Sequence, residues 1–316
     1  MSKRKLFLQL QKLTTEGINK NTYAIDTMDV ISILRQINSE DHKVADAVKN
    51  EIPHIAKAVN IVVESFKNGG RLIYVGAGTS GRLGILDAAE CPPTFGTKPA
   101  MIRGIIAGGK SAVFRAKEGA EDNKKNAKLC IKNLKIGKRD VVCGIAASLR
   151  TPFVISALRE AKNCGASTMI ITTNPRNVIK KREFAGINQY FDVTICSVVG
   201  PEVIMGSTRL KSATAQKMIL NMITTTAMIR IGKVYENFMV DLRMNSRKLE
   251  ERAKRVLMIV TGLNYISASS ALRKAGGHVK TAIVMVKTGV SLTEARRRLK
   301  SAGGFVKKAI ETQQYV

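Results

Sequence analysis

The sequence predicts an α/β protein built on a parallel β-sheet, with helical segments before and after the sheet. Five short apolar runs rich in β-branched residues alternate with helix-like stretches or glycine-rich turns, and this alternation is typical of a parallel sheet. Hydrophobic residues make up 45% of the 316-residue chain, which is enough for a sizeable core. The five strands are expected at the following positions: 71–76, 101–106, 140–146, 168–172 and 191–199.

The first predicted element is a helical segment that covers residues 1 to about 68. Apolar residues follow helical spacing from Ile31 to Ile37, and Ser39 followed by two acidic residues is typical of a helix start. A second amphipathic run covers 54–67 and ends at an Asn-Gly-Gly turn. The basic N-terminus soon meets Gln and Lys, so we expect no signal peptide, and we expect no membrane-spanning segment anywhere in the chain.

The part of the chain after the last strand is predicted to be helical. A long apolar-rich helix is expected at 208–233. Further on, residues 272–283 match residues 299–310 at eight of twelve positions, and each copy has a Gly-Gly pair at its centre. Each copy predicts a helix, a glycine turn and a second helix. We therefore divide the chain into an N-terminal helical segment (1–50), a sheet domain (51–240) and a C-terminal helical domain (241–316).

The chain is strongly basic, with 52 Lys and Arg against 24 Asp and Glu and a formal net charge of +28. Such a charge favours anionic partners such as nucleic acid, anionic membranes or phosphorylated small molecules. Trp is absent and aromatic residues make up only 5%, which disfavours binding sites built on base stacking, so we expect no nucleic-acid partner and a solvated basic surface. The five cysteines form no CxxC pair and the three histidines form no metal-ligand cluster. We therefore expect a reducing, cytoplasmic setting and no metal.

A glycine-rich loop follows the first predicted strand and opens a helix. Its glycines, at 76, 78 and 81, match the dinucleotide-binding pattern, but the end of the next strand lacks the acidic residue that a ribose requires. Backbone N–H groups and hydroxyls at a helix N-terminus suit one compact phosphate. We therefore favour sugar-phosphate binding at Gly78, Thr79 and Ser80 over a dinucleotide or a purely structural turn. Residues 104–111 satisfy the Walker A pattern by chance, because their first positions read as strand.

Two further polar segments could bind the same anion. Ser148 and Thr151 follow the third strand and offer additional hydroxyl donors. The second segment opens the long helix and carries these candidate binding residues: Glu202, Ser207, Thr208 and Lys211. A helix N-terminus with basic side chains suits an anion, although an ordinary capped loop remains the alternative for each segment.

Two carboxylates have the surroundings of acid–base groups. Glu90 precedes a Pro-Pro pair that is expected to stop its helix, and the carbonyl dipoles and apolar neighbours at a helix end disfavour the anion, as a general acid requires. Glu121 lies in an acidic run within a basic region, with capping of a helix start as the alternative. Cys91 beside Glu90 is a weaker candidate nucleophile, because no histidine is near it in the sequence.

Taken together, these segments resemble one family, the N-acetylmuramic acid 6-phosphate etherases, which are built on the sugar isomerase (SIS) domain. The resemblance is carried by residues 74–96, 116–123, 144–153 and 199–218, and it extends over almost the whole chain. It implies an SIS-type three-layer fold with flanking helices and a ubiquitin-associated-like helical C-terminal domain. It also implies a homodimeric, cofactor-free lyase of cell-wall sugar recycling, which converts N-acetylmuramic acid 6-phosphate and water to N-acetylglucosamine 6-phosphate and D-lactate.

The resemblance places the two catalytic acids of the family at Glu90 and Glu121, and its phosphate loop at Thr79 and Ser80. The reaction agrees with these residues, because an elimination needs a base, an acid for the leaving oxygen and donors for an enolate. Either carboxylate could be the base, and the position of Glu90 near a helix end favours it as the acid. Leu149 departs from the family pattern, which has Gly there. Leu neither takes a positive φ cheaply nor lets a ligand approach closely, so we expect Leu149 to crowd the ligand.

Two other functions are compatible with parts of the sequence. The first is a non-catalytic sugar-phosphate sensor like the glucokinase regulatory proteins, which the presence of both Glu90 and Glu121 disfavours. The second is an SIS-type transcriptional regulator, which would need a helix–turn–helix that residues 1–68 do not show.

Overall fold

The computed structural model describes residues 13–179, 186–242 and 246–311, which pack as two compact units. The first unit consists of Met1–Ala88 and Ala100–Ile223, and the second of Ala89–Pro99 and Thr224–Val316. No helix among the described residues is long and apolar enough to cross a membrane.

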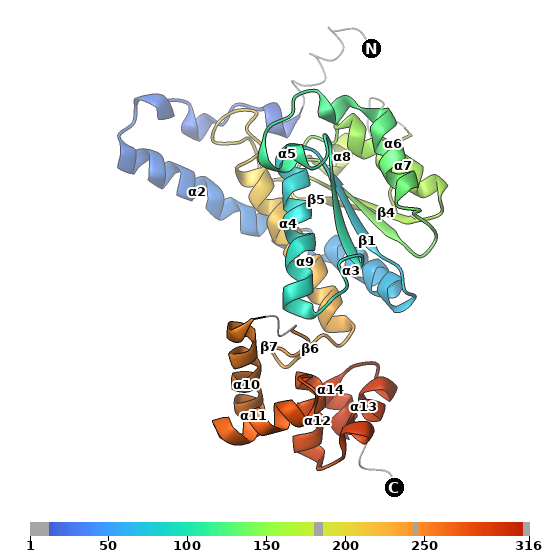
Figure 1. The fold of residues 1–316 in the computed structure, drawn as a ribbon. Coiled ribbons are helices and arrows are strands. Elements are labelled where there is room, and N and C mark those ends of the chain that lie inside the picture. The colour runs from blue at the N-terminus through green and yellow to red at the C-terminus, as the bar shows by residue number, and fades with distance from the viewer. Residues whose placement is uncertain (1–12, 180–185, 243–245, 312–316) are drawn as a thin grey trace. The chain divides into compact units, whose positions relative to one another are not determined.

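A five-stranded parallel sheet forms the centre of the first unit, in the spatial order β2-β1-β3-β4-β5 (Figure 1). The strands are β1 (Leu72–Gly76), β2 (Ile102–Ile106), β3 (Val141–Ile145), β4 (Ser167–Thr172) and β5 (Val193–Cys196). All five predicted strands are confirmed. The strand order reverses between β1 and β3, and a parallel sheet binds its ligands at such a point, outside the carboxyl ends of the strands.

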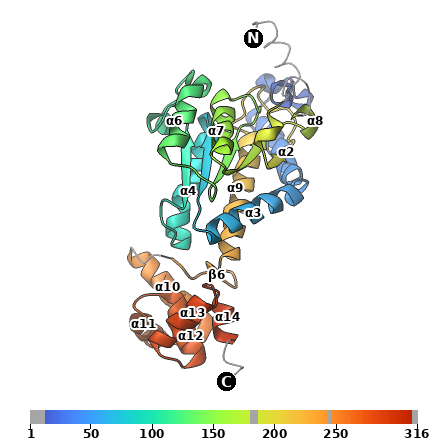
Figure 2. The ribbon, with the colours of Figure 1, turned by 90° about the vertical axis from the view of Figure 1, so that its right-hand side faces the viewer.

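Helices cover both faces of this sheet, as the α/β prediction requires. They are α3 (Ile52–Lys67), α4 (Gly78–Phe95), α6 (Lys124–Asn133), α7 (Pro152–Asn163) and α9 (Lys211–Arg230), with short helices α5 (Ser111–Phe114) and α8 (Arg176–Ile179). On one face, Leu158 of α7 packs directly over Gly144, where a Cβ would lie 2.6 Å from its Cδ1 atom. On the other face, Gly84 of α4 lies against Tyr74. Helix α6 lies beside α7 (Figures 1 and 2).

The N-terminal segment is helical, but its long helix begins earlier than predicted. Three 3₁₀ turns, η1 (Thr14–Glu16), η2 (Lys20–Thr22) and η3 (Ile25–Thr27), precede α2 (Val30–Lys49). Asp29 caps α2 by accepting hydrogen bonds from the N–H groups of Ile31 and Ser32. The predicted start at Ser39 is therefore wrong, because a stronger cap lies ten residues upstream and Ser39 falls inside the helix.

The second unit is helical apart from a small hairpin of β6 (Val234–Tyr235) and β7 (Phe238–Met239), which was not predicted. Its helices are α10 (Arg247–Thr261), α11 (Tyr265–Lys274), α12 (Val279–Thr288), α13 (Leu292–Ser301) and α14 (Val306–Glu311). The two repeat copies form α11–α12 and α13–α14, each joined by a glycine turn, so the predicted helix–turn–helix organisation of the repeat is confirmed. Asp241, whose side chain is 8% exposed, accepts from Lys233 at 2.8 Å and from Lys280 at 2.7 Å and ties the hairpin segment to α12.

Candidate active site

The glycine-rich loop at 76–81, called the Gly78 loop below, joins β1 to α4 at the carboxyl edge of the sheet. A Cβ on Gly76 would lie 2.5 Å from the backbone nitrogen of Gly81, so only glycine lets the first turn of α4 pack directly on the strand end. Gly78 has a φ of +51°, which a side chain would strain. The loop therefore presents half-buried Thr79 and Ser80 at a helix N-terminus, where backbone N–H groups and the helix dipole favour an anion.

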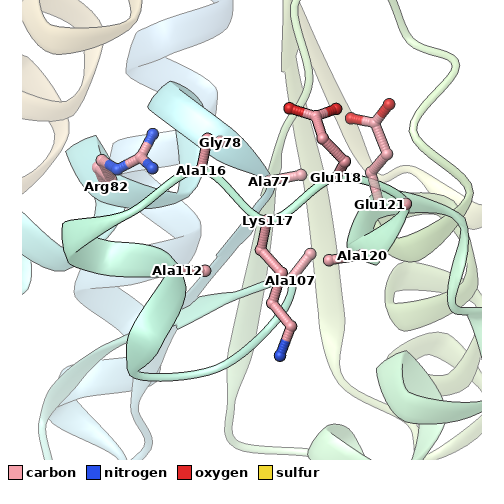
Figure 3. Close-up of a pocket in the computed structure, with 11 residues that line it drawn as sticks. Ala77, Gly78, Arg82, Ala107, Ala112, Ala116, Lys117, Glu118, Ala120 and Glu121 are labelled. Carbon is pink, nitrogen blue, oxygen red and sulfur yellow. The ribbon is translucent and has the colours of Figure 1, made fainter.

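A cavity of about 110 Å³ opens beside the Gly78 loop (Figure 3). Gly78 and Arg82 from the loop and α4 form one part of its wall, and Glu118 and Glu121 form another. Figure 3 shows the carboxylates of Glu118 and Glu121 pointing in the same general direction, while the side chain of Lys117 extends away from them. The structure therefore brings together one predicted phosphate-loop residue, Gly78, and one predicted catalytic acid, Glu121.

Sequence reasoning missed three charged residues in this cavity, Arg82, Lys117 and Glu118. Arg82 Nε donates to the carbonyl oxygen of Val113 at 2.9 Å, which fixes the guanidinium at the cavity wall. Glu118 shares its acidic run with Glu121, and Gly119 between them has a φ of +72°, so the chain turns sharply there. All three residues lie within segments that carry the family resemblance, which is the signal that could have identified them.

Glu121 lies in the 3₁₀ turn η4 (Ala120–Asp122), and its side chain is exposed. The cap of the following helix is another residue, Asn123, whose side chain accepts the N–H of Asn126 at 2.9 Å. Capping of α6 therefore does not account for Glu121. A carboxylate that is unburied and lies at the cavity wall is available to accept a proton from a bound ligand.

Glu90 lies on α4 and belongs to the second unit, where its side chain is exposed. The prediction that the Pro-Pro pair ends this helix is wrong, because α4 continues through Pro92 and Pro93 to Phe95. Proline has a φ compatible with a helix, but it removes an N–H donor and crowds the carbonyl four residues earlier, so the pair weakens the last turns of α4 without ending them. The helix ends at Gly96, whose φ of +63° cannot continue it. Cys91 is buried, with 3% of its surface exposed.

The loops after β3 and β4 are joined to the start of α9 by buried hydrogen bonds. The carbonyl oxygen of Ala147 accepts from the hydroxyls of Thr172 at 2.8 Å and Thr173 at 3.2 Å. The Thr173 hydroxyl also lies 3.2 Å from the hydroxyl of Ser212 in the first turn of α9. Ser148 and Thr151 follow Ala147 and are half-buried, and neither lines the cavity at the Gly78 loop.

Two predicted binding residues in the segment before α9 have structural partners within the protein. Glu202 is fully buried, and its carboxylate accepts the N–H groups of Lys211 at 2.9 Å and Ser212 at 2.8 Å, so it caps α9. The Lys211 ammonium donates to the Glu40 carboxylate at 2.6 Å, and both side chains are at most 2% exposed. Ser207 and Thr208 are half-buried and do not line the cavity.

The Glu40 carboxylate is held in its charged form by its surroundings. Burial alone would raise the pKa of Glu40, but hydrogen bonds from Asn21, Lys211 and Lys43 outweigh burial and lower the pKa to about 2. This carboxylate therefore balances the buried ammonium of Lys211 throughout the physiological pH range.

Leu149 adopts the left-handed backbone conformation that its position requires, with a φ of +62°. Its side chain is only 2% exposed and packs in a cluster with Leu13, Val178 and Cys196. Leu149 does not line the cavity at the Gly78 loop. The side chain is thus used for packing, and the expectation that it crowds a ligand finds no support in this arrangement.

We expect Leu149→Gly to change stability more than activity. Glycine relieves the strain of a positive φ, about 1 kcal/mol, but loses a buried leucine side chain that contributes about 2–5 kcal/mol. Thermal or urea denaturation should therefore show a loss of roughly 1–4 kcal/mol, while KM changes by less than about twofold. A large rise in kcat/KM in the glycine variant would contradict this expectation and show that Leu149 does crowd the ligand.

The residues at the cavity can hold an anion and move a proton. Gly78 at the N-terminus of α4 and Arg82 supply donors and positive potential at the cavity wall, and the carboxylates of Glu118 and Glu121 supply acceptors. The predicted phosphate-loop residues Thr79 and Ser80 follow Gly78 in the chain but do not line the cavity. Within the described ranges, no group of three or more His, Cys, Asp or Glu side chains is placed to hold a metal ion.

The sequence and the fold are similar to those of known proteins. Residues 54–162 match the family model described as "Glucokinase regulatory protein N-terminal SIS domain". The fold is similar to that of a phosphoheptose isomerase from Neisseria gonorrhoeae, with a TM-score of 0.44, 14% identity, and coverage of 62% of this chain and 96% of that chain. Residues 54–162 are thus similar to an SIS domain, and they include β1, β2 and β3 of the five-stranded parallel sheet.

Two proteins with similar sequences identify the family more closely. An N-acetylmuramic acid 6-phosphate etherase from Salinibacter ruber is 57% identical over 280 residues, which cover 88% of each chain. An etherase of the same name from Clostridium botulinum is 53% identical over 279 residues, which cover 87% of this chain and 89% of the relative. The chain belongs to the N-acetylmuramic acid 6-phosphate etherase family.

Proposed function

We propose that this protein is a carbon–oxygen lyase that cleaves the lactyl ether of N-acetylmuramic acid 6-phosphate. The products are N-acetylglucosamine 6-phosphate and D-lactate, as in recycling of cell-wall sugars. Family membership over most of the chain supports this activity. The observation that carries it in the structure is a single cavity lined by both Gly78 of the phosphate loop and the carboxylate of Glu121.

The reaction is an elimination followed by addition of water. In the open-chain sugar, the lactyl ether at C3 is β to the aldehyde, so a base can remove the C2 proton and leave an enolate. The C3–O bond then breaks, and the ether oxygen takes a proton and leaves as the hydroxyl of lactate. Water adds its oxygen to C3 of the unsaturated aldehyde, and a proton returns to C2. Acid–base groups and hydrogen-bond donors are sufficient for each step.

We assign removal of the C2 proton to Glu121 and protonation of the leaving ether oxygen to Glu90. Glu121 is exposed and lines the same cavity as Gly78 of the proposed phosphate loop, which supports a role as base. The sugar phosphate binds through the Gly78 loop, at Gly78, Thr79 and Ser80. Additional donors come from the loops after β3 and before α9, through Ser148, Thr151, Ser207 and Thr208, and we assign Glu202 and Lys211 to holding the second of these loops.

Labelled water tests the elimination. In ¹⁸O-water the label should enter the sugar at C3 and stay out of the lactate hydroxyl, because the ether oxygen leaves with lactate. Incubation with N-acetylmuramic acid 6-phosphate, enzymatic detection of D-lactate and mass spectrometry of both products measure this directly. Label in lactate would exclude cleavage of the C3–O bond, and absence of lactate would exclude the lyase.

Ser80→Ala should weaken binding of N-acetylglucosamine 6-phosphate by about 1–3 kcal/mol, the usual contribution of a hydrogen bond to a charged group. Isothermal titration calorimetry measures the affinity. Ser111→Ala is a control, because Ser111 is an exposed serine at the start of another helix, α5, and lies outside the Gly78 loop. Equal affinities for wild type and Ser80→Ala would remove this hydroxyl from the phosphate site.

A non-catalytic sugar-phosphate sensor is the second candidate function. It is favoured by the match of residues 54–162 to the SIS domain of glucokinase regulatory protein. A sensor would bind N-acetylglucosamine 6-phosphate but release no lactate from N-acetylmuramic acid 6-phosphate, so the assay above separates the two functions.

We also propose that the enzyme is a cytoplasmic homodimer, with a C-terminal helical domain of the ubiquitin-associated type and no nucleic-acid partner. Large apolar side chains on and before α2 support a second copy as the partner. Tyr23, Val30, Ile31 and Leu34 are 80%, 72%, 60% and 59% exposed. Light scattering should give a dimer mass for the wild type and a monomer mass for Ile31→Glu/Leu34→Glu. A dimer mass for this double variant would show that the dimer interface lies elsewhere on the protein.

A further inference from the structure

We propose that Gln216 is a positioning residue for the ligand phosphate, because its side-chain amide sets the direction in which the Ser80 hydroxyl donates its proton. This inference rests on the proposed function, since it takes the Gly78 loop as the phosphate site. Gln216 lies in the second turn of α9 (Lys211–Arg230), within the segment 199–218 that carries the family resemblance, but it was not among the predicted site residues.

The contact that carries the proposal joins two distant parts of the chain. Ser80 Oγ donates to Gln216 Oε1 at 2.9 Å, across 136 residues of sequence. Gln216 is only 1% exposed, and its amide nitrogen Nε2 is buried with no hydrogen-bond partner among the described residues. Buried polar groups are nearly always paired, so a buried donor without a partner directly beside a phosphate loop calls for an explanation.

The hydroxyl of Ser80 has a single proton, and this limits what it can do. A phosphate dianion only accepts hydrogen bonds. While Ser80 donates to Gln216, its hydroxyl therefore has no proton to donate to a phosphate. Binding through this hydroxyl requires Gln216 to change from acceptor to donor.

Rotation of the Gln216 amide about its last side-chain bond makes this change. Rotation exchanges Oε1 with Nε2, so that Nε2–H donates to Ser80 Oγ and the Ser80 proton turns to the phosphate. The result is a chain of hydrogen bonds from Nε2–H through the hydroxyl to a phosphate oxygen, in which each bond polarises the next. The amide nitrogen that lacks a partner in this structure then has one.

The ligand supplies the free energy for the rotation. In the empty protein, each state of the amide makes one hydrogen bond with Ser80 and leaves the other amide atom without a partner, so neither state gains a bond over the other. A hydrogen bond to an anion is roughly twice as strong as one between neutral groups, and only the rotated state can make it. The ligand therefore has different affinities for the two states, as any ligand-driven change requires.

Binding of N-acetylglucosamine 6-phosphate to the intact chain tests the proposal by calorimetry. In Gln216→Glu the carboxylate can only accept, so it retains the Ser80 proton and adds negative charge, and the affinity should fall at least about 100-fold. Gln216→Met has a similar size and removes both polar atoms, so the loss should be about tenfold. Asn221→Leu, which removes an exposed amide on the same helix, should bind like wild type.

A double-mutant cycle separates positioning from general structural support. If Gln216 acts through Ser80, then Gln216→Met should cost less than about twofold in a Ser80→Ala background, although it costs about tenfold in wild type. In turnover of N-acetylmuramic acid 6-phosphate, Gln216→Met should raise KM and leave kcat within about twofold, because the phosphate contact is the same in substrate and transition state. Loss of packing alone would lower the melting temperature without this coupling.

The outcomes decide between the alternatives. Equal costs of Gln216→Met in the two backgrounds, or wild-type affinity in Gln216→Glu, would overturn the proposal. If Gln216→Glu does not fold, Gln216→Met and the double variant decide it. If the wild type binds N-acetylglucosamine 6-phosphate with this coupling but releases no D-lactate, the lyase function fails and the positioning role stands. If lactate is released without the coupling, the lyase function stands and this inference fails.

Discussion

Glu121→Gln is expected to stop exchange of the substrate C2 proton with deuterated solvent and to slow lactate release by at least about 10²–10⁴-fold, the usual contribution of a positioned base. Glu121 and Gly78 line the same cavity, which is the basis for proposing that Glu121 acts on a sugar whose phosphate binds at the Gly78 loop. Glutamine keeps the shape of the side chain but cannot accept the proton. Proton NMR of the C2 position in D₂O and a coupled lactate assay measure the two losses.

The neighbouring carboxylate Asp122 provides a matched control. It is exposed in the same 3₁₀ turn but does not line the cavity, so Asp122→Asn should retain activity within about threefold. Glu118→Gln is informative as well, because Glu118 shares the cavity wall. A loss in Glu118→Gln as large as in Glu121→Gln would show that the two carboxylates act together.

Glu90→Gln should stop lactate release but still permit exchange at C2, because its proposed role is to protonate the leaving oxygen after the enolate has formed. The loss of lactate release should again be about 10²–10⁴-fold. Exchange that is lost in Glu90→Gln and retained in Glu121→Gln would reverse the two roles.

The second large effect is expected from the buried ion pair between Lys211 and Glu40. Lys211→Met leaves the Glu40 carboxylate buried without its main cation, and Glu40→Gln leaves the Lys211 ammonium without its anion. Removing one partner of a buried pair costs about 3–5 kcal/mol of unfolding free energy. Urea denaturation followed by circular dichroism measures this loss.

The double variant Glu40→Met/Lys211→Met should recover most of that stability, because two apolar side chains of similar volume leave no buried charge. Lys43→Met serves as the control, since Lys43 also contacts Glu40 but its side chain is 49% exposed, and exposed ion pairs contribute about 0–1 kcal/mol. If Lys211→Met, Glu40→Gln and Lys43→Met lose equal amounts of unfolding free energy, then burial is not the reason for the contribution of the Lys211–Glu40 pair to stability.

The same pair predicts a pH dependence of stability. Hydrogen bonds from Asn21, Lys211 and Lys43 lower the folded-state pKa of Glu40 from 4.5 to about 2, so the folded protein holds this carboxylate in its charged form more strongly than the unfolded chain does. The stabilisation is therefore fully present above about pH 4.5 and is lost as the pH falls towards 2. Glu40→Gln should reduce the slope of unfolding free energy against pH within this window and leave the slope unchanged near neutral pH.

Local features of the sequence were sufficient for most of the fold. The ends of the strands were predicted within a few residues, because a short β-branched run that is bounded by turn residues fits few other secondary structures. The glycine turns of the C-terminal repeat were predicted for the same reason. The errors lay at helix ends, where Asp29 replaces Ser39 as the start of α2 and Gly96 replaces the proline pair as the end of α4. Several candidate capping or helix-ending residues lie a few positions apart at such boundaries, and the sequence alone does not show which of them ends the helix.

The sequence by itself determined the strand positions and, through shared motifs, the family, and it supplied the proposed phosphate loop and the two candidate acids. Only the tertiary structure decided which polar side chains remain available to a ligand. Glu202 caps α9, Lys211 pairs with Glu40 across 171 residues of sequence, and Leu149 packs in a cluster. The physical reason is range: turn chemistry and strand propensity act over a few neighbouring residues, whereas the partner of a buried polar group depends on which distant segments the sheet order brings together.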